Sequence, residues 1–211
     1  MEPEFRPSPL ALTVLSLLHA APLHPYAMQR LIRQWGKDSV INVGQRANLY
    51  KTIKRLNQAG LIAVRHTERD QLYPERTVYE LTDAGRKAAH EWLTNMLALP
   101  RNEFPQFPAA LSFVMMLPPH EVIAVLGQRA EALRQHLAEI DADLASYSKV
   151  LPRVVLIDDE YQLAMTRAEL SWIDGVLDDL RAGNWTWSYE EFADLASTLH
   201  PDDDSIFSRP D

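Results

Sequence analysis

The segment from residue 45 to residue 65 constrains this chain more than any other, because an amphipathic helix with a cationic outer face runs directly into a strand. The apolar side chains of that helix recur at the spacing of a single helical face: Leu49, Ile53 and Leu56. The opposite face is cationic: Lys51, Lys54 and Arg55. Gly60 supplies a helix end, and the apolar run 61–64 begins a strand. A cationic helix followed by a two-stranded ribbon is what a winged helix-turn-helix uses in a DNA groove.

The residues around that segment complete a small helical unit with a β-hairpin, predicted to span residues 1–100. Apolar periodicity predicts helices over 10–20, 26–35 and about 45–59. Two strands follow, over about 61–68 and 76–81, with a turn around 70–75. Thr82 has the chemistry of a helix N-cap, which predicts a fourth helix reaching about Leu99. Residues 1–9 hold three prolines, so we expect a flexible arm there.

A proline-rich connection, predicted over 101–118 with a short helix inside it, leads into two long helices. The first long helix repeats apolar residues at alternating spacings of four and three from Leu126 to Tyr147, the pattern of a coiled-coil seam. The second, over about 155–182, carries two apolar faces, one through Tyr161 and Met165 and another through Ile173 and Leu177. Two apolar faces on one helix imply burial between partners.

These two helices predict an antiparallel hairpin over 119–183 whose surplus apolar surface is covered by a second copy of the chain. A purely intramolecular bundle is the alternative. The residues predicted for dimerisation are Leu126, Leu133, Leu137, Ile140, Leu144, Trp172, Ile173 and Leu177. The tail, 184–211, contains aromatic residues followed by acidic ones, and we expect its acidic end to be disordered. The predicted fold class is therefore mostly α, with β structure confined to the wing.

Charge divides the chain into unlike halves. Residues 1–100 carry 13 Lys and Arg against 9 Asp and Glu, whereas residues 101–211 carry 8 against 20. The asymmetry favours a cationic half that faces DNA and an acidic half that faces elsewhere, although an accidental imbalance of solvated faces is the alternative. The absence of cysteine excludes disulfides, thiolate metal sites and cysteine nucleophiles. Neither a membrane-length apolar run nor an export signal is evident, so a cytoplasmic location is expected.

The order of these elements and several motifs resemble the PadR family of transcriptional regulators. The matching residues, in chain order, are Leu10-Ala11-Leu12, Pro22-Leu23-His24-Pro25-Tyr26, Asn42-x-Gly44-Gln45, Leu49-Tyr50-x-Thr52, Arg55-Leu56, Ala59-Gly60-Leu61-Ile62 and Tyr79-x-Leu81-Thr82-x-x-Gly85-Arg86. The chain departs from the family at Pro25, where a glycine is usual, and at the wing tip, 72–75. The resemblance implies a homodimeric winged-helix protein that binds an inverted repeat in DNA. It also implies repression relieved by a small hydrophobic or phenolic effector, although family members with a longer hairpin include activators.

The start of the cationic helix is the predicted site of base contacts. Gln45, Arg46 and Asn48 are placed where side chains reach base edges, although Gln45 as a helix cap and Arg46 as a phosphate contact are alternatives. Tyr50 is expected to combine packing with a phosphate hydrogen bond. Phosphate contacts, which set affinity rather than sequence preference, are predicted for Lys51, Lys54 and Arg55.

The hairpin adds three arginines as candidates for backbone or minor-groove contact: Arg65, Arg69 and Arg76. Alternation along the first strand places Val64 and His66 on one face and Arg65 and Thr67 on the other. His66 is therefore expected to be partly packed rather than a DNA contact.

An effector pocket, if the chain has one, is predicted at the dimer interface with Trp92, Met96, Met165 and Trp172, because aromatic and methionine side chains suit flat hydrophobic ligands. The simpler interpretation of Trp92 is a core or interface residue. No motif for catalysis, a cofactor or a metal is present, and His136 with Glu139 is better explained as a solvated helix flank. A competing function class is a winged-helix module for protein assembly that does not bind DNA directly.

Overall fold

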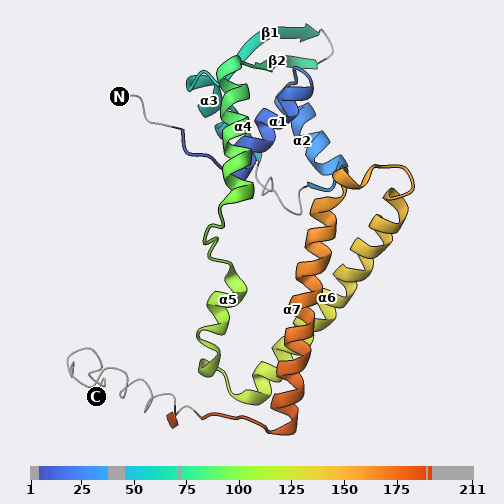
Figure 1. The fold of residues 1–211 in the computed structure, drawn as a ribbon. Coiled ribbons are helices and arrows are strands. Elements are labelled where there is room, and N and C mark those ends of the chain that lie inside the picture. The colour runs from blue at the N-terminus through green and yellow to red at the C-terminus, as the bar shows by residue number, and fades with distance from the viewer. Residues whose placement is uncertain (1–4, 38–45, 71–72, 189, 192–211) are drawn as a thin grey trace, which may run out of the picture. The chain divides into compact units, whose positions relative to one another are not determined.

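A computed structural model of the chain describes residues 5–37, 46–70, 73–188, 190 and 191. The chain forms two compact units, Met1–Asn102 and Glu103–Asp211, which are described separately below. The elements of the first unit are α1 (Pro9–Ala20), α2 (Pro25–Gln34), α3 (Arg46–Gln58), β1 (Ile62–Asp70), β2 (Tyr73–Leu81) and α4 (Asp83–Ala98). The second unit contains α5 (Gln106–Leu111), the 3-10 turns η2 (Val114–Met116) and η3 (Arg153–Val155), α6 (Pro119–Tyr147) and α7 (Ile157–Ala182) (Figure 1). The predicted class, mostly helical with a two-stranded wing, is confirmed.

Helices α1 and α2 begin at residues whose side chains cap free backbone N–H groups. The Ser8 hydroxyl accepts a hydrogen bond from the Ala11 N–H at 3.2 Å, and His24 Nδ1 accepts one from the Ala27 N–H at 3.0 Å. Pro25 is the first residue of α2, a position where the missing N–H costs nothing. The departure from the family motif at this position therefore starts the helix rather than disturbing it.

The core of the first unit is built on the predicted apolar face of α3. Leu49, Ile53 and Leu56 are buried against α1 and α2, whose buried side chains include Leu15 and Met28. Gly60 ends α3 in the left-handed region at φ +68°, as its position in the sequence predicts. Burial of one helical face fixes the rotation of α3, so its opposite face must point to solvent.

The predicted cap of α4 is also confirmed. The Thr82 hydroxyl accepts a hydrogen bond from the Gly85 N–H at 3.0 Å and lies 2.9 Å from the carbonyl oxygen of Leu61. A Cβ atom at Gly85 would lie 2.0 Å from that same oxygen, so no other residue fits without backbone movement. The glycine of the sequence motif is thus explained by the close approach of α4 to the start of β1.

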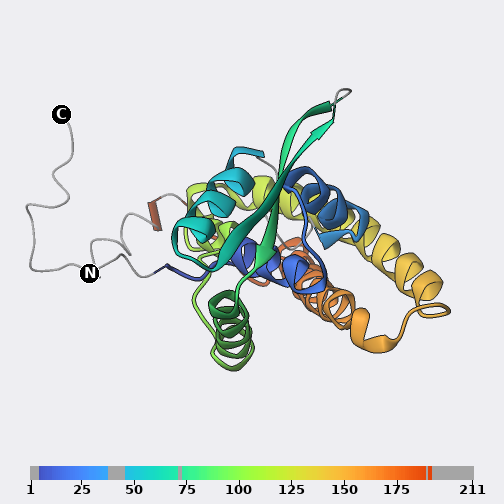
Figure 2. The ribbon, with the colours of Figure 1, turned by 90° about the horizontal axis from the view of Figure 1, so that it is seen from above.

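Strands β1 and β2 pair antiparallel, from Ile62 opposite Leu81 to Asp70 opposite Tyr73. Both strands are longer than predicted, and the hairpin extends beyond the helices of its unit (Figure 2). The register shifts between Val64 and His66 and again between Glu68 and Asp70. The prediction that His66 is partly packed is wrong, because the first irregularity breaks the alternation on which it rested and His66 is exposed.

The flexible arm predicted over residues 1–9 is wrong for residues 5–9. Pro9 is already helical, Ser8 caps α1, and the Phe5 ring stacks on Trp92 of α4 with centroids 5.4 Å apart. Residues 1–4 lie outside the described part of the chain, as do most of the predicted connection before α3 and the acidic end of the tail.

The second unit is dominated by the antiparallel pair α6 and α7, as the sequence predicts (Figure 1). Its core is formed by residues from both helices: Val122, Leu126, Ala130, Ile173, Leu177 and Leu180. Arginines tie the two helices together through Arg134 with Asp174 at 2.7 Å and Arg167 with Asp141 at 2.9 Å. No helix in the described ranges has the length and apolar character needed to cross a membrane.

Candidate nucleic-acid interface

The outer face of α3 presents a group of polar and cationic side chains to solvent. The predicted contacts that the structure describes are all exposed there: Asn48, Tyr50, Lys51, Lys54 and Arg55. They are held in place by the buried face of the same helix, so their spacing is set by the helix rather than by a loop. Sequence periodicity and structure therefore agree on which side of α3 is available to a partner.

This face carries positive charge that no acidic side chain compensates in the part of the chain that the structure describes. The sequence of α3 contains no acidic residue, and among the described residues no carboxylate pairs with Lys51 or Lys54. Unpaired cations along one helix suit a polyanion such as double-stranded DNA, because their binding to phosphates releases the counterions that are condensed on the DNA. We use the name α3 face for the five exposed side chains on this side of the helix: Asn48, Tyr50, Lys51, Lys54 and Arg55.

The start of α3 is less fully described. Gln45 lies outside the described residues, and for Arg46 the structure describes the backbone, at the first position of α3, but not the side chain. Their assignment to base edges therefore stays a prediction. Asn48, one helical turn further, is exposed on the α3 face.

The arginines of the hairpin are engaged with neighbours inside the same unit. Arg65 lies 3.7 Å from Glu80 on the paired strand, and the Arg76 guanidinium lies over the ring of Tyr26 at 5.9 Å from its centroid. The backbone of Arg69 belongs to β1, but its side chain lies outside what the structure describes. A phosphate would have to compete with Glu80 for Arg65, so this contact is expected to be weaker than those of the lysines of α3.

Two aromatic residues near these cations were missed by the sequence analysis. Phe5 lies under the Arg55 guanidinium, at 4.9 Å from its ring centroid, and Tyr26 lies under Arg76. Neither contact follows a local spacing, because the partners are far apart in the sequence. The only signal for Phe5 was a lone aromatic residue within a proline-rich arm.

The residues predicted for dimerisation differ in how far the single chain buries them: some are buried, some are half-buried and one is half exposed. Leu126, Ile173 and Leu177 are buried inside the α6–α7 pair of a single chain, which accounts for them without a partner. Half-buried residues continue along α6, whereas Trp172 is half exposed. The half-buried group is Leu133, Leu137, Ile140 and Leu144.

A second apolar face of α7 is only partly covered by the described residues of the single chain, through the edge-on contact of Phe107 with Trp172. Its large side chains recur at helical spacing and are each about half exposed: Ile157, Tyr161, Met165 and Trp172. We name these residues the α7 stripe. It corresponds to the apolar face predicted from the sequence through Tyr161 and Met165. The other predicted face, through Ile173 and Leu177, packs against α6, so the intramolecular hairpin buries only one of the two faces.

The residues predicted for an effector pocket belong to two different units, so the pocket stays a prediction. Trp92 is buried in the core of the first unit and Met96 packs against the same core, whereas Met165 belongs to the second unit and to the α7 stripe. For Trp92 the simpler core interpretation matches its surroundings, since its ring is covered by Phe5.

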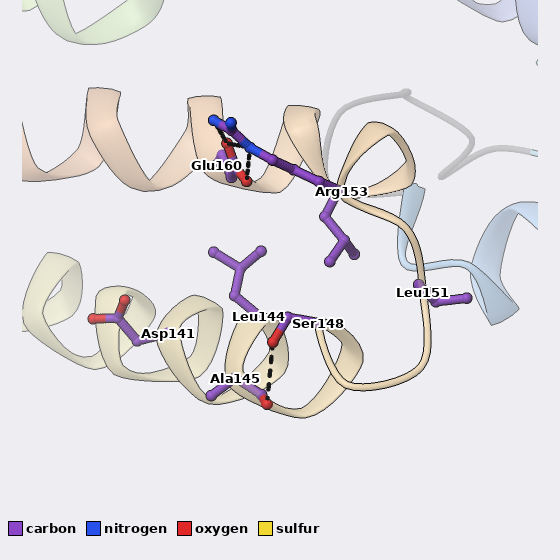
Figure 3. Close-up of a pocket in the computed structure, with 8 residues that line it drawn as sticks. Asp141, Leu144, Ala145, Ser148, Leu151, Arg153 and Glu160 are labelled. Carbon is purple, nitrogen blue, oxygen red and sulfur yellow. Dashed lines mark hydrogen bonds and ion pairs between the residues drawn. The ribbon is translucent and has the colours of Figure 1, made fainter.

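A cavity of about 490 Å³ lies at the α6–α7 turn (Figure 3). Leu144 and Leu156 supply apolar lining, and on the α7 side of the cavity Arg153 binds Glu160 with Nη2 and Oε2 2.9 Å apart. The hydrogen bonds from Arg153 hold the pKa of the Glu160 carboxyl below its ordinary value, and the same contact raises the pKa of Arg153. Among the described residues no cluster of side chains is able to hold a metal ion.

Comparison with known proteins points to one group. Residues 14–91 match the family model described as "Transcriptional regulator PadR-like family". The curated "Negative transcriptional regulator PadR" of Bacillus subtilis (strain 168) is 22% identical over 142 residues, which cover 62% of this chain and 76% of that protein.

Two solved structures of Bacillus subtilis PadR share the fold. The complex with operator DNA has a TM-score of 0.67 at 18% identity and covers 83% of this chain and 99% of that chain. The complex with p-coumaric acid has a TM-score of 0.64 at 17% identity and covers 82% of this chain and 98% of that chain.

Proposed function

This chain belongs to the PadR-like family of transcriptional regulators, and from that premise we propose that it acts as a homodimer that binds double-stranded DNA at an inverted repeat. The observation that carries the proposal is the α3 face, a row of exposed cations without acidic partners on the second helix of a helix-turn-helix. In this fold that helix enters the major groove, while the wing reaches the neighbouring backbone or minor groove.

The side chains of the α3 face and of the start of α3 have distinct roles in this proposal. Three cations neutralise phosphates and set affinity for any sequence: Lys51, Lys54 and Arg55. Arg46 and Asn48, together with Gln45, contact base edges, where arginine recognises guanine and an amide recognises adenine. Tyr50 donates a hydrogen bond to a phosphate, and the hairpin arginines add weaker contacts to the backbone: Arg65, Arg69 and Arg76.

The α7 stripe supports the homodimer. A helix with one face packed on α6 and large apolar side chains exposed on another has surface that water solvates poorly. A two-fold axis brings the same stripe of two chains together and holds two α3 helices for the two halves of an inverted repeat. Leu133, Leu137, Ile140, Leu144 and Trp172 contribute directly, and the buried residues Leu126, Ile173 and Leu177 keep the hairpin in shape.

Regulation by a small hydrophobic or phenolic effector is the last part of the proposal. It is supported by the names of the similar proteins, a negative regulator and a complex with p-coumaric acid. Repression is accordingly the proposed sign of regulation. A regulator family is not an enzyme class, and the proposal assigns no catalytic residue; action on chromosomal DNA would place the protein in the cytoplasm.

A gel-shift experiment with promoter DNA from the neighbourhood of its own gene tests the proposal. We expect a shift that is selective for sequence and weakens steeply with salt. If the protein shifts unrelated duplexes with equal affinity, the assignment of base contacts to the start of α3 is wrong. If the protein binds no duplex even at low salt, DNA binding is wrong and the alternative, a winged-helix module for protein assembly, takes its place.

A further inference from the structure

Phe5 joins the N-terminal arm to two helices of the first unit. One side of its ring stacks on Trp92 of α4, with ring planes inclined by 16° and centroids 5.4 Å apart. The guanidinium of Arg55, near the end of α3, lies over the same ring at 4.9 Å from its centroid. The three side chains therefore form a stack that connects the arm, α3 and α4.

The arm is held close to this stack at its other end as well. Ser8, three residues after Phe5, caps α1 through a hydrogen bond to the Ala11 N–H, and Pro9 begins the helix. Phe5 itself is partly buried against the core of the first unit. Because both ends of this short segment are fixed, the ring is a defined part of the surface rather than a transient cover.

The contact with Phe5 leaves the hydrogen-bonding capacity of Arg55 intact. A phenyl ring has no oxygen or nitrogen atom that accepts a hydrogen bond, so the guanidinium N–H groups remain available to phosphate oxygens. Arg55 is exposed, and among the described residues no carboxylate pairs with it. An arginine held in one orientation also loses less side-chain freedom when it binds than one that moves freely.

We propose that Phe5 is a positioning residue of the DNA interface, which holds Arg55 at the end of α3 so that its free edge meets the phosphate backbone. The inference rests on the proposed function and deepens it, because it makes the N-terminal arm part of the DNA-binding surface. Trp92, in turn, supports the ring from the core side and links that surface to α4.

Binding of the promoter duplex by Phe5 variants measures the contribution of the ring. Phe5→Leu keeps an apolar contact with Trp92 but removes the aromatic face, whereas Phe5→Tyr keeps both. We expect Phe5→Leu to weaken binding by about three- to tenfold and Phe5→Tyr to bind as the unmodified protein does. Equal binding by Phe5→Leu and the unmodified protein would overturn the proposal.

A double-mutant cycle separates positioning from general stabilisation of the arm. If Phe5 acts through Arg55, Phe5→Leu has no further effect in an Arg55→Ala background. Lys51 supplies the matched control, since Lys51→Ala removes another cation of α3. In the Lys51→Ala background, Phe5→Leu should still weaken binding of the duplex by the full factor. A loss that persists equally in both backgrounds contradicts a role through Arg55.

A measurement without DNA distinguishes failure of this inference from failure of the proposed function. The ring current of Phe5 should displace the NMR signal of the Arg55 Nε–H, which is assigned by its disappearance in Arg55→Lys. We expect the signal to move towards the ordinary arginine position in Phe5→Leu and to stay in Phe5→Tyr. An unmoved signal overturns the stack, whereas a displaced signal in a protein that binds no duplex leaves the contact intact and refutes only its use for DNA.

Discussion

Among the described residues no carboxylate pairs with the lysines of the α3 face, whereas three arginines of the α6–α7 pair are each neutralised by a carboxylate of the facing helix: Arg129, Arg134 and Arg167. Apolar side chains show the opposite distribution. The buried apolar side chains of α3 are at most 2% exposed to solvent, whereas the side chain of Met165 in the α7 stripe is 52% exposed.

The contrast indicates what each unit is built to bind. Charge that is not compensated within a unit is available to an oppositely charged partner, and apolar surface that is not buried is available to an apolar one. The first unit therefore suits a polyanion and the second suits protein. The overall charge of −8 hides this, because the acidic second unit outweighs the cationic first one.

The largest expected effect is on stability, and it is measured by comparing a buried isoleucine of the first unit with an exposed isoleucine of the second. Ile53 is buried in the core of the first unit and Ile157 lies on the α7 stripe. Ile53→Ala should lower the free energy of unfolding by about 2–5 kcal/mol, because it leaves a cavity. Ile157→Ala should change it by about 0.5 kcal/mol or less in dilute, monomeric protein. Urea unfolding of both variants makes the comparison, and similar losses would contradict the assignment of the two surfaces.

The next effect concerns association of the second unit. Met165→Asp places a charge in the α7 stripe, and we expect the dimer dissociation constant to rise by about 10- to 100-fold, because the charge must be desolvated at the interface. Ser171→Asp adds the same charge at an exposed polar position of the same helix and should leave association unchanged. Sedimentation equilibrium measures both, and an intact dimer in Met165→Asp would remove the α7 stripe from the interface.

A smaller effect separates unpaired from paired cations. The double variant Lys51→Ala, Lys54→Ala should weaken binding of the promoter duplex by about tenfold at moderate salt and reduce the salt slope by about 2. Arg134→Ala removes a cation that is already paired with Asp174 and should bind DNA as before. Fluorescence anisotropy across a salt series gives both quantities. An unchanged slope in the lysine variant would show that these side chains do not contact phosphate.

Features that depend on neighbours in the sequence were predictable. The buried side of α3, the Thr82 cap and the two faces of α7 all follow from spacings within one helix or one turn. Local patterns report such features because helix geometry repeats over a few residues.

Features that depend on distant partners were not predictable. The stack of Phe5 with Arg55 and Trp92 joins three separate elements, and the irregularity in β1 breaks the alternation next to His66 without a glycine or proline to mark it. The heptad spacing of α6 illustrates the same limit, because periodicity predicts a packed helix pair but not which chain supplies the partner. In the structure α7 of the same chain buries Leu126, whereas the α7 stripe and the half-buried residues of α6 keep exposed surface that a second copy could cover.

The smallest expected effect lies at the α6–α7 turn, where a cation is paired at the protein surface. Arg153 lowers the pKa of Glu160, so the contact stabilises the folded state when pH is above the ordinary glutamate value of about 4.3 and ceases to do so as pH falls through the lowered value. Glu160→Gln should therefore lower the urea midpoint slightly at pH 7, and the difference from the unmodified protein should vanish once the pH has fallen below the lowered pKa of Glu160. Asp143→Asn is the matched control, since among the described residues no cation pairs with Asp143. A difference that persists undiminished in acid would mean that Glu160 stabilises the turn by packing rather than by charge, and the pairing of cations in the second unit would then lose one of its examples.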